Sequence, residues 1–504
     1  MNQPIDTGTP VDMSVVLPIA VAVFLFWLIK RRLRVRRVKS PLDRPLLTWP
    51  DGSPLTVGHL LRSIEVKGIT GSGKSSGSGA RLMQAIVSCS RSTMLIIAQK
   101  PEERDEVARL FKKYRKPLIV IEEGGKERMN FLEVERAAGA DTRQMTELLM
   151  TLGEVLDGGN GRSSDPFWKK LEERILYNAL EALRLGTGRV TAADLLEFIT
   201  SAPYSSAQIK DDEWRKGFHF RVMDAAFKKT KTTIEERDFR LASAFWSSEF
   251  PQMDDKPRSS GLAGVFNTVH TFNTGLVSEI CSTKTTVSPQ VFEKGASILV
   301  NFPFAQYGPS GRFIAGGIKY LAQKHILRRK WNPKGYFNVL HCDEFQECVT
   351  EFDSRYLAQC RSHGGSMLTL TQTVHSEYSG MGGGGASRHK VDALSSNYGT
   401  HVYHLCDPAT AEKASGLLGQ RLEAVVNMST GDSDAYDLLF GSRPYKPNVQ
   451  RSYQPILQPG VLMGALRTGG ARSGGIVDGL VIRPGEPFRS GENFQWVAFK
   501  QPRR

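Results

Sequence analysis

The stretch "VKGITGSGKSSGSG", Val66 to Gly79, decides the fold class of this 504-residue chain. Residues 68–75 fit the pattern G-x4-G-K-[ST], between an apolar run that ends at Val66 and the helical pattern "SGSGARLMQAIVSCS". Glycines in such a loop let consecutive backbone N–H groups wrap a phosphate, and the N-terminus of the following helix adds partial positive charge. The alternative is a flexible Gly/Ser linker that contains a lysine. The strand and helix patterns on either side favour a phosphate-binding loop.

Two residues of this motif have defined chemical roles. Lys74 is predicted to reach the β- and γ-phosphates of a nucleotide, and the Ser75 hydroxyl is predicted to ligate Mg²⁺. The predicted cofactors are therefore ATP and Mg²⁺. The predicted nucleotide-binding residues are Gly68, Thr70, Gly71, Ser72, Gly73, Lys74, Ser75 and Ser76.

A loop of this kind predicts a carboxylate site at the end of another buried strand. The run "FNVLHCDEF", residues 337–345, supplies Asp343 and Glu344 after an apolar strand pattern. Asp343 is predicted to hold Mg²⁺ through water, and Glu344 to polarise the attacking water. Adjacent Asp-Glu pairs are common on surfaces, so the prediction depends on the apolar run and on the loop at residues 68–75. His341, inside the strand, is interpreted as a core or interface residue.

Two further polar residues follow in "YLAQCRSHGGSMLTLTQT". Gln372 comes just after a predicted buried strand, where an amide can bind the terminal phosphate or the water and report the nucleotide state. The alternative is an ordinary surface amide at a strand end. Arg361 stands at a predicted helix end, either as a surface charge that stabilises the helix C-terminus or as an arginine finger for a neighbouring subunit's nucleotide. The second role requires a ring of subunits.

The pattern along the chain predicts an α/β fold. Apolar runs without alternation, such as "TMLIIAQK", "PLIVIEE" and "ASILVNF", are separated by helical patterns, which is typical of a parallel sheet covered on both faces. Ser75 and Asp343 lie 268 residues apart. Three or four βα units of about 30 residues fill only part of this gap. Because the pattern is helical from about Arg143 to Phe250, we expect an inserted, mainly helical domain.

The N-terminal region predicts a membrane anchor. Met13 to Ile29 runs for seventeen residues without a charge, and the basic segment "KRRLRVRRVK" follows it. This length gives roughly 26 Å of helix against a hydrocarbon core of about 30 Å, and Trp27 and the snorkelling Lys30 can make up the difference. The positive-inside rule then places everything after Lys30 in the cytoplasm. A buried core helix is the alternative.

Net charge and cysteine content add weaker constraints. The net charge of +14 includes seven positive charges in the basic segment, so a nucleic-acid partner is permitted but not demanded. The six cysteines form no CxxC pair and no zinc-ligand spacing. We therefore expect reduced, mostly buried thiols.

With these residues in place, the chain resembles the coupling proteins of conjugation and type IV secretion, the TraG/TraD type of the FtsK- and HerA-like translocases. The resemblance covers nearly the whole chain: the N-terminal apolar segment, "GITGSGKSS", "VLHCDEF", "CRSHGG" with "TLTQT", and "DPATAEKASGLLGQR". The spacing of Glu344, Arg361 and Gln372 is similar to the family's catalytic acid, arginine finger and sensor glutamine. The chain departs from the family in its single membrane helix, where two are usual, and in Gln99 before Lys100, where Asp is frequent.

The resemblance implies a RecA-like P-loop NTPase motor domain with an inserted all-α domain and an N-terminal transmembrane helix. The implied catalytic residues are Lys74, Glu344, Arg361 and Gln372. We expect a short extracytoplasmic N-terminus at 1–12, the transmembrane helix at 13–30 and a basic juxtamembrane linker at 31–60. The motor domain is expected in two parts, at 61–185 and at 270–504, and the second part includes a C-terminal tail. The all-α domain is expected between them, at 186–269.

The resemblance also implies a function. It is that of an ATP hydrolase at the cell inner membrane, a single-pass protein with a cytoplasmic body. It would assemble into a homo-hexamer, recruit DNA with its relaxase or relaxosome proteins, and deliver the DNA to a type IV secretion channel. The all-α domain is our candidate for recognising this cargo.

Three other functions remain open. One is a secretion ATPase for protein effectors, and another is an FtsK-like or phage-type DNA-packaging motor, against which the helical insertion argues. The third is a receptor that binds nucleotide only as a structural ligand. The intact set of Lys74, Ser75, Asp343 and Glu344 argues against a receptor, because degenerate ATPases typically lose the carboxylate.

Overall fold

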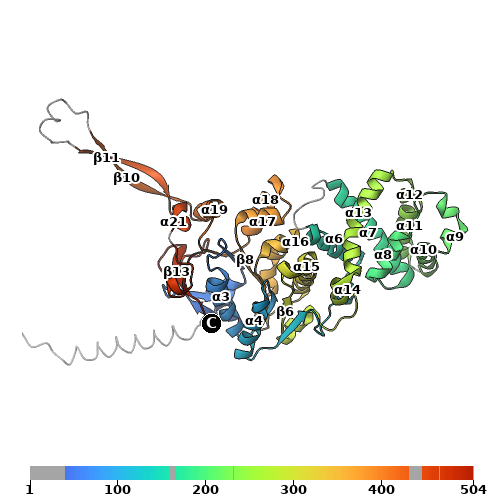
Figure 1. Ribbon diagram of the computed structural model, residues 1–504, viewed down its shortest axis with the longest axis horizontal. Coiled ribbons are helices and arrows are strands. Elements are labelled where there is room, and N and C mark those ends of the chain that lie inside the picture. Colours follow the sequence, from blue (N-terminus) through green and yellow to red (C-terminus); the bar gives the residue numbers. More distant parts are fainter. Residues whose placement is uncertain (1–39, 158–165, 231, 431–444, 465, 503–504) are drawn as a thin grey trace, which may run out of the picture.

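The computed structural model describes residues 40–157, 166–230, 232–430, 445–464 and 466–502. Its centre is a nine-stranded sheet with the order β13-β12-β9-β3-β8-β7-β4-β6-β5 (Figure 1). From β9 to β5 all neighbours are parallel, and β12 and β13 extend the β9 edge in antiparallel fashion. The strands are Ile64–Lys67 (β3), Ser92–Ile97 (β4), Leu118–Glu122 (β5), Ser297–Asn301 (β6), Phe337–Cys342 (β7), Gly365–Thr371 (β8), Thr400–Tyr403 (β9), Ile476–Ile482 (β12) and Phe494–Lys500 (β13).

The predicted α/β fold with a parallel sheet is confirmed. Strands β4, β7 and β8 are buried along their whole length, which explains why their sequences lack alternation. Met94 and Ile96 pack on one face of the sheet, and Leu95 and Ile97 pack on the other.

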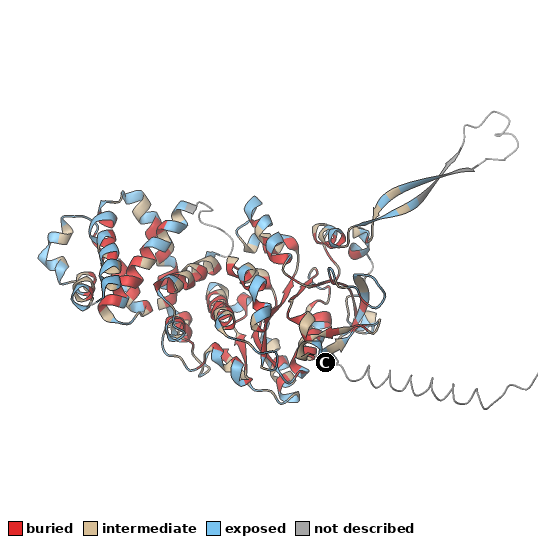
Figure 2. Ribbon diagram, turned by 180° about the vertical axis from the view of Figure 1, so that it is seen from behind, coloured by how far each residue is buried: buried red, intermediate tan, exposed pale blue. Residues whose placement is uncertain are grey.

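Helices cover both faces of the sheet. Helices α3 (Ala80–Ser88) and α4 (Pro101–Lys113) pack on the face that carries Met94, and α15 (Phe304–Arg328) and α16 (Glu351–Gln359) pack on the opposite face. Figure 2 shows the buried residues gathered in the sheet and along the helix surfaces that face it. The other elements of this part are β1 (Pro45–Thr48), β2 (Pro54–Thr56), α2 (Val57–Leu60), α17 (Val374–Gly380), α18 (Gly384–Ser395), α19 (Pro408–Leu418), β10 (Gln420–Thr430), β11 (Tyr445–Pro455) and α21 (Pro459–Met463).

A run of helices separates β5 from β6 and forms the end of the molecule farthest from β13 (Figure 1). The aromatic rings of Phe198, Trp246 and Phe250 pack together in its core, with Trp246 5.4 Å and 5.0 Å from the other two centroids. Residues 186 and 269, the expected borders of the all-α domain, fall inside α7 and α13. The helices are α5 (Phe131–Ala137), α6 (Thr142–Asp157), α7 (Pro166–Thr187), α8 (Ala192–Thr200), α9 (Asp212–Arg215), α10 (Phe218–Lys229), α11 (Thr233–Ala244), α12 (Phe250–Gln252), α13 (Asp255–Asn273) and α14 (Gly275–Cys281).

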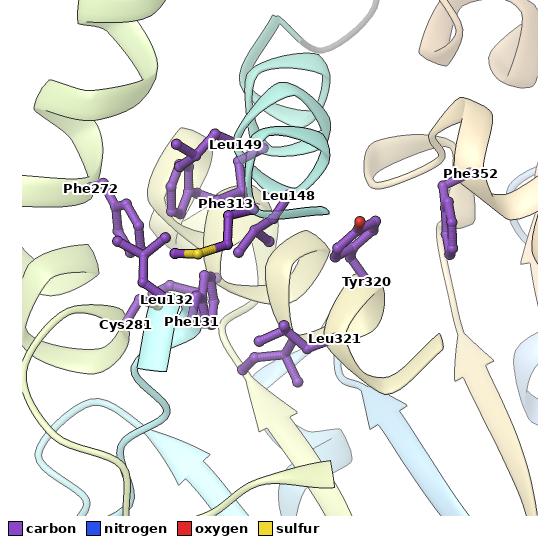
Figure 3. Close-up of a cluster of buried hydrophobic side chains, with 14 of the residues drawn as sticks. Phe131, Leu132, Leu148, Leu149, Phe272, Cys281, Phe313, Tyr320, Leu321 and Phe352 are labelled. Atoms are coloured by element: carbon purple, nitrogen blue, oxygen red, sulfur yellow. The ribbon is translucent and has the colours of Figure 1, made fainter. Parts of the chain in front are cut away.

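A cluster of aromatic side chains joins these helices to the sheet (Figure 3). The Phe131 ring lies 5.8 Å from Phe272 of α13 and 6.3 Å from Phe313 of α15, measured between centroids. Gly317 of α15 leaves room for Phe131, because a Cβ there would stand 2.1 Å from the ring. The helical end therefore shares one continuous core with the sheet.

Within the described residues, no helix combines the length and apolar character needed to span a bilayer. The transmembrane helix predicted at residues 13–30 lies outside the described residues. The six cysteines are all buried, as the sequence predicts.

Candidate functional site

All the predicted site residues except Arg361 gather at one edge of the sheet, beyond the carboxyl ends of three adjacent strands. Residues 68–75 follow β3, Asp343 and Glu344 follow β7, and Gln372 follows β8, which lies between the other two. The carboxyl ends of parallel strands meet at the same edge, and ligands of open α/β sheets bind there. The sheet topology therefore brings together residues that are hundreds of positions apart in the sequence.

The loop after β3 needs glycine at defined positions. Gly71 and Gly73 have φ angles of 78° and 84°, in the left-handed region. A Cβ on Gly73 would stand 2.7 Å from Val477, and one on Gly68 would stand 2.5 Å from the Ser72 Oγ. The loop is thus folded tightly against its surroundings, which excludes the flexible-linker interpretation.

The same loop presents hydrogen-bond donors that lack a partner. The Ser72 hydroxyl is buried and has no hydrogen-bond partner, and the backbone N–H groups of Gly71, Gly73 and Lys74 pair with no backbone acceptor among the described residues. Nothing lies within 4 Å of the Cβ position of Gly71. Unpaired donors around a glycine turn fit an anion such as a phosphate.

Ser75 and Asp343 form the second part of the site. The Ser75 Oγ donates to Asp343 Oδ2 at 2.8 Å, and the Glu344 N–H donates to Asp343 Oδ1 at 2.9 Å. Asp343 is buried, with 3% of its surface exposed. A hydroxyl beside a buried carboxylate is a donor set of hard oxygen atoms, which suits Mg²⁺.

The Glu344 carboxylate is held by three neighbours. Lys74 Nζ lies 3.4 Å from its Oε1, and the side-chain amides of Gln372 and Gln346 donate to its Oε2 at 3.1 Å and 2.7 Å. Glu344 has a φ angle of 46°, which is rare for a residue with a side chain and costs conformational energy. The surrounding structure therefore fixes this carboxylate in a defined position next to the lysine.

Gln372 bridges the loop and the acidic pair. Its Oε1 accepts from the Thr70 hydroxyl at 3.1 Å, while its amide nitrogen donates to Glu344. A movement of Thr70 in the loop can therefore shift Gln372, and through it the position of Glu344.

Arg361 does not join these residues. It is exposed in a short 3₁₀ helix, Cys360–His363, that precedes β8, whereas Gln372 follows the same strand. The seven residues of β8 separate them by roughly 23 Å. Arg361 forms no ion pair with a carboxylate of the described residues. Its guanidinium therefore lies at the opposite edge of the sheet from the loop of its own chain.

Residues from the C-terminal part of the chain also line the loop, and no sequence pattern indicates them. The Gln501 amide nitrogen donates to the Ser76 Oγ at 2.6 Å, and its Oε1 accepts from the Gly470 N–H at 2.8 Å. Val477 of β12 packs on Gly73 and Gly77. The antiparallel strands β12 and β13 thus place this segment directly on the phosphate-binding loop.

A further acidic side chain, Glu103 at the start of α4, lies close to the acidic pair. The Gln99 N–H donates to its Oε2 at 2.8 Å. Burial, and then the charge of Asp343, raise the pKa of Glu103 to about 7. Gln99 is itself buried and its amide nitrogen has no partner. Sequence reasoning noted Gln99 only as a departure from a family pattern and missed Glu103.

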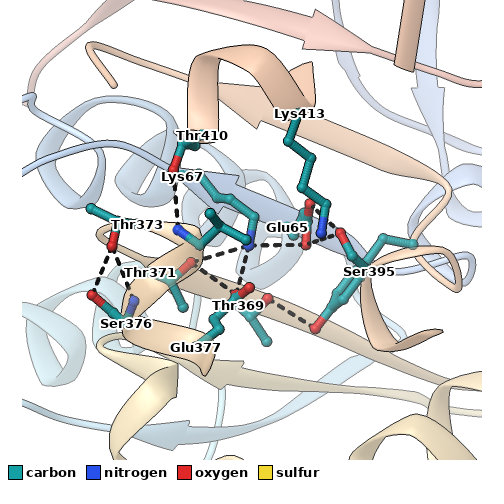
Figure 4. Close-up of polar contacts among 12 residues, drawn as sticks. Glu65, Lys67, Thr369, Thr371, Thr373, Ser376, Glu377, Ser395, Thr410 and Lys413 are labelled. Carbon is teal, nitrogen blue, oxygen red and sulfur yellow. Dashed lines mark hydrogen bonds and ion pairs between the residues drawn. The ribbon is translucent and has the colours of Figure 1, made fainter. Parts of the chain in front are cut away.

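A buried network of charges lies directly beneath the loop (Figure 4). Lys67 Nζ contacts Glu377 at 2.6 Å and Glu65 at 3.4 Å, and the Thr371 hydroxyl donates to Glu377 at 3.0 Å. Burial lowers the pKa of Lys67, but the charges of Glu377 and Glu65 outweigh this effect and raise it. Because Lys67 precedes Gly68 and Thr371 precedes Gln372, the network fixes the loop and Gln372 relative to each other.

His404, after β9, connects the helix of the loop to β12. Its Nε2 lies 2.7 Å from the Ser78 Oγ, and its Nδ1 lies 2.7 Å from the carbonyl oxygen of Asp478. The carbonyl can only accept, so Nδ1 carries the hydrogen and Nε2 accepts from Ser78. Burial lowers the pKa of His404 to about 4, so the ring is neutral at pH 7.

Because His404 is neutral in the folded protein, we expect the protein to lose stability in acid. The pKa of His404 is about 4 in the folded chain and about 6.5 in the unfolded chain. Between these values the unfolded chain binds more protons than the folded chain. The contribution of His404 to the free energy of unfolding is therefore lost as pH falls from 6.5 to 4. The expected loss is about 3 kcal/mol of unfolding free energy. His404→Gln keeps an acceptor and a donor, and urea unfolding should show a shallower acid dependence by about this amount. The control His375→Gln, at an exposed position, should unfold like the parent chain, and an unchanged acid slope for His404→Gln would contradict the prediction.

The fold and the site together have the arrangement of a P-loop: a glycine loop after a buried strand, with an acidic pair at the same edge of the sheet. Among solved structures, the chain is similar to the bacterial conjugative coupling protein TrwB. The unbound form matches with 14% identity and a TM-score of 0.60 over 94% of this chain and 92% of that chain. The complex with a non-hydrolysable ATP analogue gives 14% identity and a TM-score of 0.59 over 94% and 93% of the two chains, and the complex with ADP and Mg²⁺ gives 13% and 0.54 over 93% and 91%.

The likeness to TrwB extends over nearly the full length of both chains and establishes a shared fold. The sequence-based resemblance to coupling proteins is thereby confirmed at the level of the fold. No protein-family model and no curated protein sequence matches the chain.

Proposed function

We propose that this chain is a membrane-anchored, ATP-driven DNA translocase, the coupling protein that recruits a relaxase–DNA substrate and delivers it to a type IV secretion or conjugation channel. The observation that carries the proposal is the position of Glu344, held between Lys74 of the loop and Gln372 of β8 in a chain with the fold of TrwB. A carboxylate held in this position beside a phosphate-binding loop suits a general base for nucleotide hydrolysis.

The residues of the site fit ATP and Mg²⁺. The unpaired N–H groups of the loop and the buried Ser72 hydroxyl would hold the phosphates, and Ser75 with Asp343 would hold the metal ion. Bound Mg²⁺ would neutralise charge on the phosphate oxygens. TrwB, which shares the fold, has been solved with an ATP analogue and with ADP and Mg²⁺.

Three side chains of the site would then have separate roles in hydrolysis. We expect Lys74, whose Nζ lies 3.4 Å from Glu344, to turn toward a bound phosphate, which carries the larger negative charge. Glu344, released from the lysine but still hydrogen-bonded by Gln346, orients a water molecule and takes its proton. Gln372, bonded to both Thr70 and Glu344, reports whether the loop is filled.

We infer the assembly and the location from the sequence. Arg361 lies at the edge of the sheet opposite the loop, so an arginine-finger role requires a neighbouring subunit, which supports a closed ring, here a homo-hexamer. Residues 13–30 would anchor the ring in the inner membrane with the body in the cytoplasm. The all-α domain at 186–269 would contact the cargo and its relaxosome proteins.

The test of this function is ATP hydrolysis by a fragment that begins at Ser40, with and without single- and double-stranded DNA. This fragment retains every described element. We expect DNA to raise the turnover number severalfold, because a translocase couples hydrolysis to movement along its substrate, and the preferred form of DNA identifies that substrate. Glu344→Gln supplies the background rate. If neither form of DNA changes the turnover number of the fragment or of the full chain, the result would contradict DNA translocation and favour a protein cargo.

A further inference from the structure

The strands β10 and β11 form an arm that leaves the body of the molecule (Figure 1). Eleven residues of each strand pair in antiparallel register, from Gln420 opposite Pro455 to Thr430 opposite Tyr445, and neither strand joins another sheet. At 3.4 Å per residue the arm is about 37 Å long. A two-stranded ribbon is only marginally stable in water without a third surface to pack against.

The register makes the arm amphipathic. On one face Leu422 lies opposite Tyr453, and these side chains are 53% and 68% exposed. Farther along the same face, Val449, 60% exposed, occupies a position opposite residue 426, which is also valine. The alternate positions, which belong to the other face, pair Arg421 with Gln454 and Glu423 with Ser452. The first face also carries exposed Arg451, opposite Ala424, among these three exposed apolar side chains, and we call it the apolar face; the other face is mainly polar.

The same chain carries a hollow with a complementary lining. It measures about 360 Å³, and its wall includes Val461 of α21, Trp496 and Val497 of β13, and the ion pair of Arg467 with Asp478. Val461 and Trp496 are 46% and 39% exposed. Helix α21 begins four residues after β11 ends, so the hollow lies at the root of the arm, at the same end of the molecule (Figure 1).

We propose that the apolar face of the arm docks into this hollow on a second copy of the chain. The arm extends away from its own body, so its apolar face stays uncovered within one molecule (Figure 2). An arm on one copy and a hollow on the next make a head-to-tail contact, which repeats around a closed ring when the rotation closes. The arm and the hollow lie at the same end of the molecule. All arm-to-hollow contacts would therefore lie at the same height along the axis of such a ring.

The docking surface borders the nucleotide site of the receiving copy. Asp478, in the wall of the hollow, pairs with Arg467, and its backbone carbonyl accepts from His404, which contacts Ser78. Its neighbour Val477 packs against Gly73 of the loop. This inference deepens the ring assembly proposed above. A ring held by other contacts would still form without the arm, so the two proposals can fail separately.

The first experiment mixes two full-length chains in detergent, each with one substitution and its own affinity tag. One chain carries Tyr453→Cys on the arm, and the other carries Trp496→Cys in the hollow. The native cysteines are all buried, so mild oxidation reports the new pair. We expect a disulfide-linked species that contains both tags. A chain with Ser452→Cys, on the polar face, replaces Tyr453→Cys as the matched control and should give at least about tenfold less product.

Three outcomes of this experiment would overturn the proposal. Either no mixed product forms above the Ser452→Cys level, or a chain with both substitutions links only within itself, which would place the arm on its own hollow. A product formed mainly between two Tyr453→Cys arms would also contradict it, because it would indicate an arm-to-arm contact instead.

A second measurement does not depend on disulfide geometry. Tyr453→Asp places a charge on the apolar face, and self-association measured by sedimentation should weaken at least about tenfold, as expected when an aromatic anchor of an interface is lost. Ser452→Asp should associate like the parent. Unchanged association of Tyr453→Asp, or loss of binding to anionic phospholipid vesicles with association intact, would overturn the proposal and, in the second case, assign the arm to the membrane surface.

Discussion

Replacing Glu344 with glutamine should leave ATP binding intact and lower the hydrolysis rate by about 10²–10⁴-fold, the usual contribution of a positioned general base. The amide oxygen can still accept from Gln372 and Gln346, so the local structure persists, but it cannot take a proton from water. Loss of the negative charge also frees Lys74, which favours nucleotide binding. The affinity for a fluorescent ATP analogue and the turnover number, measured on the same preparation, test both parts.

The matched control for Glu344→Gln is Glu347→Gln. Glu347 lies three residues farther along the same segment, where it pairs with Arg312 outside the site. This control should keep its turnover number within about twofold of the parent, because partly exposed ion pairs contribute little. Near-normal turnover by Glu344→Gln would contradict the role of general base.

Arg361→Ala should lower the hydrolysis rate by about 10³–10⁵-fold, although Arg361 lies far from the phosphate-binding loop of its own chain. The physical reason is that a neighbouring subunit's guanidinium would stabilise charge on the transferring phosphate. The decisive test mixes Arg361→Ala chains with Glu344→Gln chains, each inactive alone. In randomly mixed rings about a quarter of the sites combine an intact Glu344 with an intact neighbouring Arg361, so activity should return to about a quarter of the parent level.

The control for the mixing experiment is Arg355→Ala, on the same helical segment, where Arg355 pairs with Glu147 and is 64% exposed. It should hydrolyse ATP like the parent. Mixtures of Arg361→Ala and Glu344→Gln that stay inactive while still forming rings would show that Arg361 does not act between subunits.

The central fold and the core of the site could be predicted because local sequence determines them. An apolar run without alternation indicates a strand buried on both faces, and the polar residue after it must lie at the carboxyl edge of the sheet. Lys74, Glu344 and Gln372 each follow this rule, and the structure brings Lys74 within ion-pair distance and Gln372 within hydrogen-bonding distance of Glu344.

The remaining parts of the site depend on contacts that no local pattern encodes. Gln501 reaches Ser76 only because β12 and β13 extend the β9 edge, whereas their sequences show only short β-like runs in a glycine-rich segment. Glu103 resembles any acidic residue in the first turn of a surface helix until α4 places it beside Asp343. The arm's lack of a covering layer is visible only in three dimensions.

The position of β3 between β8 and β9 has a consequence for synthesis on the ribosome. The phosphate-binding loop emerges early, but both strands that flank β3 lie roughly 300 residues farther along the chain. At 5–20 residues per second, the nascent chain waits on the order of 15–60 seconds before β3 can pair. During that interval the strand has two open edges and the loop has no acidic partner. The candidate site is therefore incomplete until the sheet closes, and until then the unpaired strand can associate wrongly with other chains.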